Sequence, residues 1–412
     1  MLLARFLNRM IKFGRLTVID VDGRAHHFGP DDGGPTSTIR LHKRALHTTL
    51  GINPKLYFGE AYMDGLVTVE DGTIRDCLEV IISNIARLEP TLHERMLRWL
   101  RRLIRPITQH NPLGRARENV AHHYDLSDTL YDVFLDSDRQ YSCAYFESPN
   151  DGLEQAQDAK KRHLAAKLLL EPGQKVLDIG SGWGGLGIYL AQVAGVDVTG
   201  VTLSEEQHKV SQARAGEARL DDRVRFYLRD YREQTGQFDR IVSVGMFEHI
   251  GVKHYGEFFA KLTELLSDDG VALLHTIGRS DEPGSTAPWV VKYIFPGSYV
   301  PALSEVMPAV ERAGLIVTDI EVLRLHYAET LKAWYQRFTE NRDKVAALYD
   351  ERFCRMWEYY LTACEMAFRY WDQNVFQIQL AKRVETVPLT RDYIRDWEQA
   401  HRQPAAQAMA SD

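Results

Sequence analysis

The stretch Val176-Leu-Asp-Ile-Gly-Ser-Gly-Trp-Gly-Gly-Leu-Gly-Ile-Tyr-Leu-Ala191 decides the fold. Its first four residues form a short, mostly apolar run, which predicts a parallel strand buried on both faces. Gly180, Gly182 and Gly184 predict a tight turn whose backbone can come close to a ligand. We expect an amphipathic helix from about Leu186, with the positive end of its dipole facing the turn. A nucleotide-like ligand would then bind at the carboxyl end of the strand.

The spacing of the glycines separates several nucleotide-binding motifs. Only Gly185 would complete the dinucleotide pattern Gly-x-Gly-x-x-Gly, and no Gly-Lys-Ser/Thr follows the turn. The second expected strand, residues 196–202, ends without the acidic residue that would hold an NAD ribose. Asp178 before the turn resembles the first motif of class I S-adenosylmethionine (SAM) methyltransferases. SAM is therefore favoured over a nicotinamide cofactor, and a purely structural turn is the other alternative.

Length and composition limit the function classes. The chain has 412 residues and 44% hydrophobic residues, enough for two or three domains with real cores. Its net charge of −7 argues against a general nucleic-acid binder. Four cysteines without Cys-x-x-Cys spacing indicate reduced thiols in a cytoplasm and predict no metal site. No uninterrupted apolar stretch of about 20 residues occurs, which argues against secretion and membrane spanning.

The N-terminal part predicts a small α+β domain that extends, with a linker, over residues 1–105. We expect a hairpin over 16–28 that turns at Asp22-Gly23, strands near 38–41 and 66–69, and a helix over 74–88. Residues 1–13 predict a basic amphipathic helix, which could contact a bilayer but is favoured to dock on its own domain. Residues 94–105 carry five arginines among apolar residues and predict an amphipathic linker helix facing solvent or membrane, or simply packed on both domains.

Residues 106–412 predict a doubly wound α/β domain, because strand and helix patterns alternate along them. After two short helices over 119–134 and an aromatic stretch over 140–146, a helix over 153–170 leads into the opening strand. Further strands are expected at 224–227, 238–244 and 271–276, and a hairpin-like pair near 315–325, with helices over 205–218 and after Phe258. The aromatic-rich tail, 342–382, has helical periodicity and is expected as core or as an acyl-chain tunnel.

Polar groups gather where these strands are expected to end. Glu248 follows the fourth strand and His275 ends the fifth, so both should project over the crevice with Tyr327. Such groups could bind a small anion or act as a general base. The alternatives are a buried core histidine at 275, a packing tyrosine at 327 and a small buried hydrophobe at Cys143. The five-residue spacing of His249 and His254 does not favour zinc.

Five motifs in order resemble the cyclopropane-fatty-acyl-phospholipid synthase family. They are Tyr-Ser-Cys-Ala-Tyr-Phe at 141–146, Val-Leu-Asp-Ile-Gly-Ser-Gly-Trp-Gly-Gly at 176–185, Gly-Val-Thr-Leu-Ser-Glu-Glu-Gln at 200–207, Met-Phe-Glu-His-Ile-Gly at 246–251 and Leu-His-Thr-Ile-Gly at 274–278. The resemblance covers about 119–380, and the N-terminal domain resembles that of the long bacterial members. It implies a class I SAM-methyltransferase (Rossmann-like) sheet with a helical lid.

The resemblance also implies two sets of site residues. SAM would be contacted by Tyr141, Ser142, Asp178, Gly180, Gly182, Thr202, Gln207 and Tyr231. A bicarbonate ion would be held by Cys143, Glu248, His275, Ile277 and Tyr327, with Cys143 and Ile277 acting through main-chain amides. Ser181 stands where the family commonly has cysteine. This difference should not matter, because the turn would contact the cofactor through its backbone and not through this side chain. The second strand lacks an acid for the ribose, so Gln207 or a lid residue must substitute.

The implied enzyme transfers a methylene from SAM to the cis double bond of an unsaturated phospholipid acyl chain. A carbocation forms, and placed bicarbonate removes a proton so that the ring closes, in a dry, aromatic-lined tunnel. The alternatives are a relative that leaves a methyl branch or methylated alkene, and a non-catalytic lipid-binding protein. The enzyme is expected in the cytoplasm, bound peripherally to the inner face of the membrane. It is expected not to bind nucleic acid, and a homodimer is left open.

Overall fold

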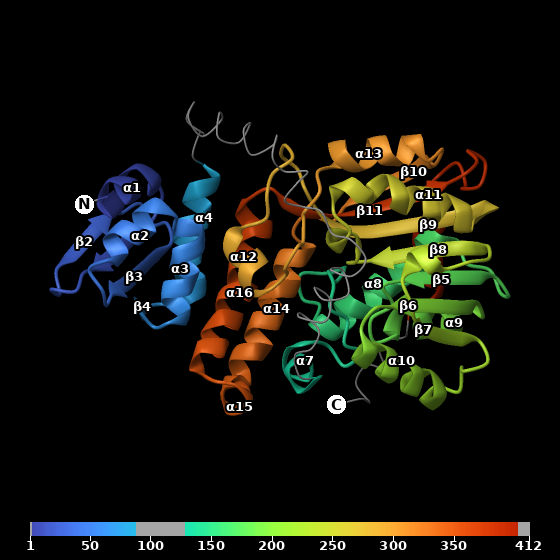
Figure 1. Cartoon of the computed structure of the whole chain (residues 1–412), viewed down its shortest axis with the longest axis horizontal. Coiled ribbons are helices and arrows are strands. Elements are labelled where there is room, and N and C mark those ends of the chain that lie inside the picture. Colours follow the sequence, from blue (N-terminus) through green and yellow to red (C-terminus); the bar gives the residue numbers. More distant parts are fainter. Residues whose placement is uncertain (1, 88–127, 403–412) are drawn as a thin grey trace.

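The computed structural model describes residues 2–87 and 128–402, and contains two sheets (Figure 1). The smaller sheet has the order β2-β1-β3-β4, from strands Arg15–Ile19 (β1), Ala25–Phe28 (β2), Thr36–Leu41 (β3) and Val67–Asp71 (β4). Its helices are Leu2–Met10 (α1), Leu46–Ile52 (α2), Pro54–Met63 (α3) and Ile74–Ala86 (α4). The predicted hairpin is confirmed, because β1 and β2 pair antiparallel across Asp22-Gly23. The two later strands are present as β3 and β4, and the helix predicted over 74–88 is present as α4.

Helix α1 docks on its own domain. Leu3, Leu7 and Met10, which form its apolar stripe, are at most 6% exposed and belong to the core of this part of the chain. This finding supports docking over bilayer contact, because the apolar face is already covered. The predicted arginine-rich helix over 94–105 and the first of the two short helices before residue 128 lie outside the described residues. The second is Asp128–Phe134 (α7).

The larger sheet has seven strands in the order β10-β11-β9-β8-β5-β6-β7. The strands are Lys175–Ile179 (β5), Asp197–Thr202 (β6), Val224–Leu228 (β7), Phe238–Val244 (β8), Leu266–Arg279 (β9), Ile316–Val322 (β10) and Gln373–Ala381 (β11). β7, β6, β5, β8 and β9 run parallel, whereas β11 is antiparallel to both of its neighbours. The parallel order places the carboxyl ends of β5, β6 and β8 at one edge.

Helices cover both faces of this sheet, as the doubly wound prediction requires. Val176 and Val242 pack with Leu153–Leu168 (α8) and Gly185–Ala194 (α9). Their neighbours Leu177 and Ile241 belong to a separate cluster with Tyr255–Leu265 (α11) and Leu303–Arg312 (α13). Consecutive residues thus enter opposite cores, because side chains alternate across a strand. The remaining helices of this half are Glu205–Glu217 (α10) and Asp392–Ala400 (α17).

Two predictions for the last strands are wrong. Residues 315–325 contain the single strand β10, not a hairpin, and its partner β11 comes from the tail that was predicted to be helical through 382. The helix of the tail ends at Tyr370, and Phe376, Ile378 and Leu380 then alternate with glutamines. This alternation is the period of a strand. Its pairing with β9, about 100 residues earlier in the chain, cannot be recognised locally.

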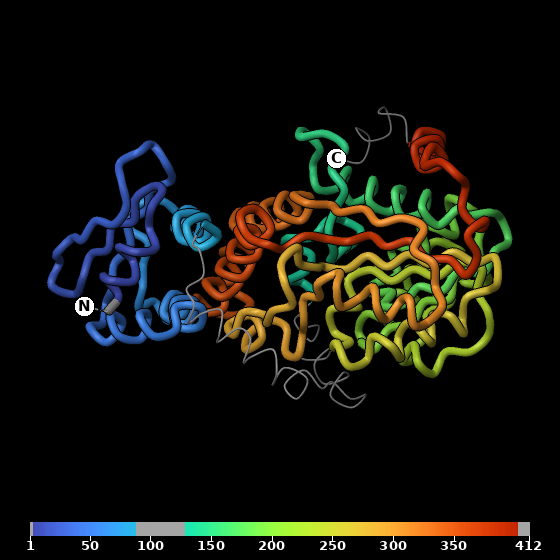
Figure 2. Tube along the Cα trace, turned by 90° about the horizontal axis from the view of Figure 1, so that it is seen from above, coloured from blue at the N-terminus to red at the C-terminus, as the bar shows by residue number. Residues whose placement is uncertain are grey.

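Helices of the C-terminal part lie between the two sheets (Figures 1 and 2). They are His326–Glu340 (α14) and, from the aromatic tail, Arg342–Leu348 (α15) and Glu351–Tyr370 (α16), next to the short helix Pro288–Tyr293 (α12). On the N-terminal side, α16 contacts α3 and α4, with Arg75 Nη2 at 2.7 Å from Glu365 Oε1 and the Tyr62 hydroxyl donating to Glu358 at 3.0 Å. Trp357 and Tyr360 belong to one apolar cluster with residues of both parts. These aromatic residues are therefore core.

Within the described ranges, no helix combines the length and apolar character needed to cross a membrane.

Candidate active site

The glycine turn after β5 has backbone angles that require glycine. Gly180, Gly182 and Gly184 have φ of 85°, 55° and 84°, in the left-handed region. The amides of Gly180 and Ser181 donate to the Val201 carbonyl at 2.9 and 3.0 Å, which holds the turn against β6. A Cβ at Gly180 would lie 2.9 Å from Met246 Cβ. The turn therefore passes close to the loop after β8, and α9 begins directly behind it.

One cleft opens at this edge of the sheet, with about 1260 Å³ of space including the part open to solvent. All eight residues predicted to contact SAM line it: Tyr141, Ser142, Asp178, Gly180, Gly182, Thr202, Gln207 and Tyr231. They come from the end of β5 and the turn after it, the end of β6, the first turn of α10, the segment after β7 and the loop before α8. The structure thus brings this whole set together around one space.

Asp178 is the acidic group of this cleft. The side chain is 2% exposed, and its Oδ2 has no hydrogen-bond partner among the described residues. Burial raises the pKa of Asp178 to about 7, although the positive charge of Lys160 opposes the shift. An unpartnered carboxylate oxygen at a ligand cleft fits an ammonium group, which SAM carries on its methionine part. Together with the glycine turn that lines the same space, it makes the cleft compatible with SAM.

The residues for the ribose differ from those of a dinucleotide site. No acid stands at the end of β6; Thr202 Oγ1 instead donates to Gln207 Oε1 at 3.1 Å, and both residues line the cleft. Asp230 also lines it, but its carboxylate binds the guanidinium of Arg232 at 2.8 Å. Sequence reasoning missed Asp230 and Arg232, and no motif signals them because they follow the short strand β7. Trp183, Met246 and His249 line the cleft as well, and all three stand inside the quoted motifs.

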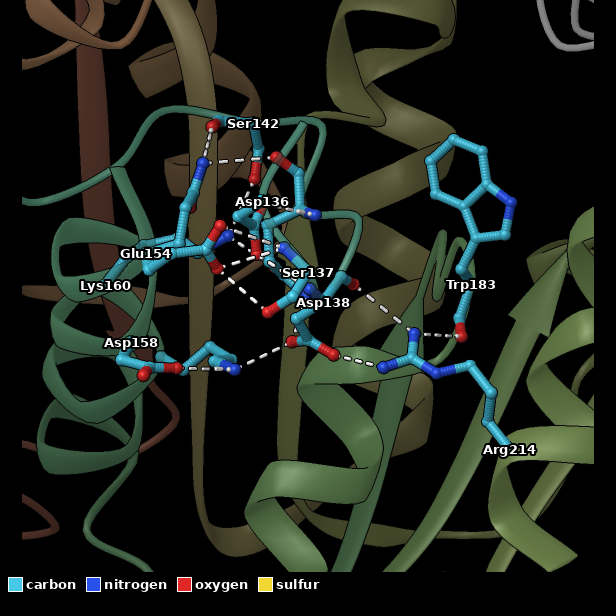
Figure 3. A network of polar contacts seen from close by, with 12 residues as sticks. Asp136, Ser137, Asp138, Ser142, Glu154, Asp158, Lys160, Trp183 and Arg214 are labelled. Atoms are coloured by element: carbon cyan, nitrogen blue, oxygen red, sulfur yellow. Dashed lines mark hydrogen bonds and ion pairs between the residues drawn. The ribbon is translucent and has the colours of Figure 1, made fainter. Parts of the chain in front are cut away.

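A buried polar network fixes the segment before α8 (Figure 3). Lys160 Nζ is fully buried and donates to Gln140 Oε1 at 2.5 Å and to Ser142 Oγ at 2.9 Å. The Asp138 carboxylate binds the guanidinium of Arg214, which also donates to the Trp183 carbonyl at 2.9 Å (Figure 3). Tyr141 and Ser142 are thereby held on the cleft. The role of Lys160 was missed, since a lysine in a polar helical stretch ordinarily indicates a solvated face.

Cys143, one residue beyond this cleft wall, is fully buried. Burial raises the pKa of its thiol well above the ordinary range, so the cysteine is not a thiolate. The next amide, of Ala144, donates to Thr330 Oγ1 on α14 at 3.0 Å. Tyr327 lies one turn earlier on the same helix and packs against Trp334 and Phe368. Cys143, Tyr327 and Ile277 share one packed apolar cluster.

Glu248 and Ile277 are in direct contact. Glu248 lies in a short 3-10 turn, Phe247–His249, and its Oε1 accepts the Ile277 amide at 2.5 Å. Its Oε2 is buried and has no hydrogen-bond partner among the described residues. Burial raises the pKa of Glu248 to about 7, against the lowering effect of the Ile277 amide. The amide predicted to bind bicarbonate is thus used by Glu248 in this structure.

His275 does not end the fifth strand as predicted. β9 continues to Arg279, because β11 pairs with it over its whole second half. His275 is 2% exposed, and burial holds its pKa well below the usual range, so the ring is neutral. Neither His275 nor Glu248 lines the cleft, which corrects the expectation that both project over it.

The described residues also contain no group of three or more His, Cys, Asp or Glu side chains that could hold a metal ion.

Comparison with known proteins identifies the family. Residues 112–378 match the family described as mycolic acid cyclopropane synthetase, and residues 3–89 match a domain of unknown function. The chain is 41% identical to a cyclopropane-fatty-acyl-phospholipid synthase of Escherichia coli, over 86% of this chain and 90% of that protein. It is 35% identical to the tuberculostearic acid methyltransferase UfaA1 of Mycobacterium tuberculosis, over 92% and 90% of the two chains.

Solved structures identify the same family. The mycolic acid cyclopropane synthase CmaA1, complexed with SAH and CTAB, is 34% identical and has a TM-score of 0.62. The match covers 66% of this chain and 99% of that one. The predicted class I methyltransferase fold is confirmed, and the bound SAH of the neighbour agrees with the SAM assignment. The chain therefore belongs to the cyclopropane synthase family of SAM-dependent methyltransferases.

Proposed function

We propose that this enzyme converts the cis double bond of an unsaturated phospholipid acyl chain into a cyclopropane ring. The observation that carries the proposal is the continuous segment Tyr141-Ser142-Cys143. Its first two residues line the cleft, and its third enters the buried cluster that contains Tyr327 and Ile277. A methyl donor and an apolar acceptor chain could therefore meet across one short segment. The relatives named as cyclopropane synthases support this reading.

In the proposed reaction, SAM supplies an electrophilic methyl group. The alkene forms a new C–C bond to that methyl as the C–S bond breaks, which leaves a carbocation on the acyl chain. Loss of one proton from the transferred methyl then closes the ring with a second C–C bond. Water would capture the cation, so the site must be dry. Tyr327, Trp334 and Phe368 are buried aromatic residues, of which Tyr327 contacts the other two, and aromatic faces stabilise positive charge by about 1–2 kcal/mol each when desolvated.

We further propose bicarbonate as the proton acceptor, held by Glu248, His275 and Tyr327 with the amides of Cys143 and Ile277. The unpartnered, buried Oε2 of Glu248 supports an additional polar group at this place. With a pKa of about 7, Glu248 can carry a proton at neutral pH and donate it to an anion. A neutral His275 adds a second donor without adding a charge. The Ile277 amide would have to be shared with Glu248, since the two are bonded.

Three further assignments remain predictions. One is peripheral association with the inner face of the membrane, where the phospholipid lies. Another is the homodimer. The third is the division into an N-terminal unit over 1–105 and a methyltransferase unit over 106–412; the separate family matches at 3–89 and 112–378 support it. Flotation of the purified protein with anionic vesicles and sedimentation analysis would test the first two.

The central test is incubation of the purified protein with SAM and vesicles of a cis-monounsaturated phospholipid, followed by fatty-acid analysis. We expect a product that is heavier by one CH₂ group and that, unlike an alkene, resists hydrogenation. Vesicles of the saturated phospholipid serve as the control. Absence of the heavier fatty acid under conditions where SAH binds would refute the proposal.

A second candidate product is a methyl branch or a methylated alkene. The chain is 35% identical to a tuberculostearic acid methyltransferase over 92% of its length, so this second product is included in the test. SAM with a fully deuterated methyl separates the outcomes, because ring closure removes one of the three methyl deuteriums. A ring retains two, whereas a methyl branch or a methylated alkene with an intact methyl group retains all three. An exocyclic methylene would also retain two, but unlike the ring it is hydrogenated as an alkene.

A non-catalytic lipid-binding protein is the remaining alternative. It predicts that SAM and SAH do not bind in calorimetry and that Glu248→Gln changes nothing. Loss of product in this variant, with SAH affinity unchanged, would exclude a purely binding role.

A further inference from the structure

Gln377 lies directly opposite His275 in the antiparallel pair of β11 and β9. Its Nε2 is 3.2 Å from His275 Nδ1, and the glutamine is fully buried. Strand pairing fixes both backbones, so the contact does not depend on a mobile loop. The atom that Gln377 presents decides which ring nitrogen of His275 carries the proton.

Lys167 decides which atom of the Gln377 amide faces His275. Its Nζ is 2.7 Å from Gln377 Oε1, in a buried position. An ammonium group only donates hydrogen bonds, so the atom facing it must be the amide oxygen. The NH₂ group then points to His275 Nδ1, which has to accept. The orientation of the amide is thus determined by chemistry and not only by the fit of the side chain.

The charge on Lys167 is maintained by a chain of ionic groups that leads outward. Lys167 also pairs with Glu321, and His163 Nε2 lies 2.7 Å from the same carboxylate. Burial alone would raise the pKa of Glu321, but the His163 hydrogen bond and the Lys167 charge lower it to about 2. Burial lowers the pKa of Lys167, and the ionised Glu321 opposes that shift. His163 Nδ1 lies 2.6 Å from Glu398, which completes the chain.

We infer that Lys167 and Gln377 act as positioning residues that hold neutral His275 in the tautomer with its proton on Nε2. Resting on the proposed function, this assigns the Nε2–H of His275 as a donor to the bicarbonate ion, with a fixed direction. With the opposite tautomer, Nε2 would present a lone pair to an anion, which repels it. Neither Lys167 nor Gln377 contacts the reacting atoms; both act through His275.

The test reads the tautomer directly, by NMR of the full chain labelled with ¹⁵N in the histidine rings. The His275→Asn variant identifies the signals of His275 among the 15 histidines. In the wild-type protein we expect a protonated Nε2 and an unprotonated Nδ1. Gln377→Glu replaces the donor by an acceptor, so Nδ1 should gain a proton. Product formation should fall about 10- to 100-fold, the range typical of residues that orient metal-binding histidines, with SAH affinity within about twofold.

Two controls separate positioning from general damage to the core. Lys167→Met should populate both tautomers, because the amide is free to turn, whereas Lys167→Arg retains a donor-only cation and should restore the wild-type signal. Gln379→Glu places the same change two residues along β11, where the glutamine contacts the Lys167 carbonyl and Tyr393. It should leave the signals of His275 unchanged.

A protonated Nδ1 in the wild-type protein, or a Gln377→Glu variant that keeps the wild-type signals, would overturn the inference. The readout is independent of turnover. If no cyclopropane forms but His275 has the expected tautomer, the proposed function fails and the positioning role stands.

Discussion

Glu248 Oε1 accepts the backbone amide of Ile277 at 2.5 Å, which ties the turn after β8 to strand β9. The same carboxyl is buried, and its pKa is raised to about 7. The residue predicted to hold an anion is therefore itself a titrating group near neutral pH. Its ionisation therefore makes the stability of the fold depend on pH.

Glu248→Gln should change how stability depends on pH. Burial disfavours the carboxylate, so the folded protein binds a proton that the unfolded chain has released above its ordinary pKa of 4.5. This group therefore destabilises the fold progressively as pH rises from about 4.5 to about 7, by on the order of 3 kcal/mol in total. We expect the difference in free energy of unfolding, variant minus wild type, to be larger at about pH 8 than at about pH 5. Urea unfolding at the two pH values measures this difference. A pH-independent difference would contradict the raised pKa.

The cleft should bind SAH more tightly as pH rises towards about 7, because Asp178 must ionise to pair with the ligand's ammonium group. Below its pKa, binding should release a proton, and affinity should change by at most about tenfold per pH unit. Asp178→Asn should bind more weakly and lose this dependence. Calorimetry in buffers of different ionisation enthalpy measures the proton release. Glu248→Gln is the matched control and should retain it, since Glu248 does not line the cleft.

Alanine at two glycines of the turn should have unequal effects. Both Gly180 and Gly182 have positive φ, so each substitution costs backbone energy of roughly 1–2 kcal/mol. At Gly180 the new Cβ would also lie 2.9 Å from Met246 Cβ, whereas at Gly182 no atom lies within 4 Å. We expect Gly180→Ala to be the more destabilised and to bind SAH more weakly than Gly182→Ala. Thermal unfolding and calorimetry would decide, and equal losses would argue against a tight approach to Met246.

Arg75→Met should weaken the contact between α4 and α16. Glu365 is fully buried, and removal of Arg75 leaves Arg369 as its remaining ionic partner among the residues that the structure describes. We expect a loss of about 1–3 kcal/mol in the free energy of unfolding, with part of it recovered in Arg75→Met/Glu365→Gln. Arg44→Met is the control, because the exposed Arg44–Asp22 pair should contribute at most about 1 kcal/mol. Similar losses in both single variants would contradict a special role for the buried pair.

Much of the cofactor cleft was predictable because its causes are local. Glycines with positive φ after a buried strand specify the turn, and the carboxyl ends of parallel strands meet at one edge. The family resemblance, and not a local pattern, assigned residues as far apart as Tyr141 and Tyr231 to one site, and the structure puts both on the cleft. The positions of Glu248 and His275 away from the cleft were not predictable, because β9 extends beyond His275 only when β11 pairs with it.

By itself, the sequence determined the strand–turn–helix unit, the alternation that builds the sheet and the set of motifs that names the family. The tertiary structure alone decided which polar groups are buried. Helix α8 reads as a solvated helix, yet Lys160, His163 and Lys167 are at most 3% exposed. Charged side chains are stable there only because their partners arrive from β10, β11, α17 and the segment before α8. Those partners are distant in sequence, so no local pattern contains the network that orients His275.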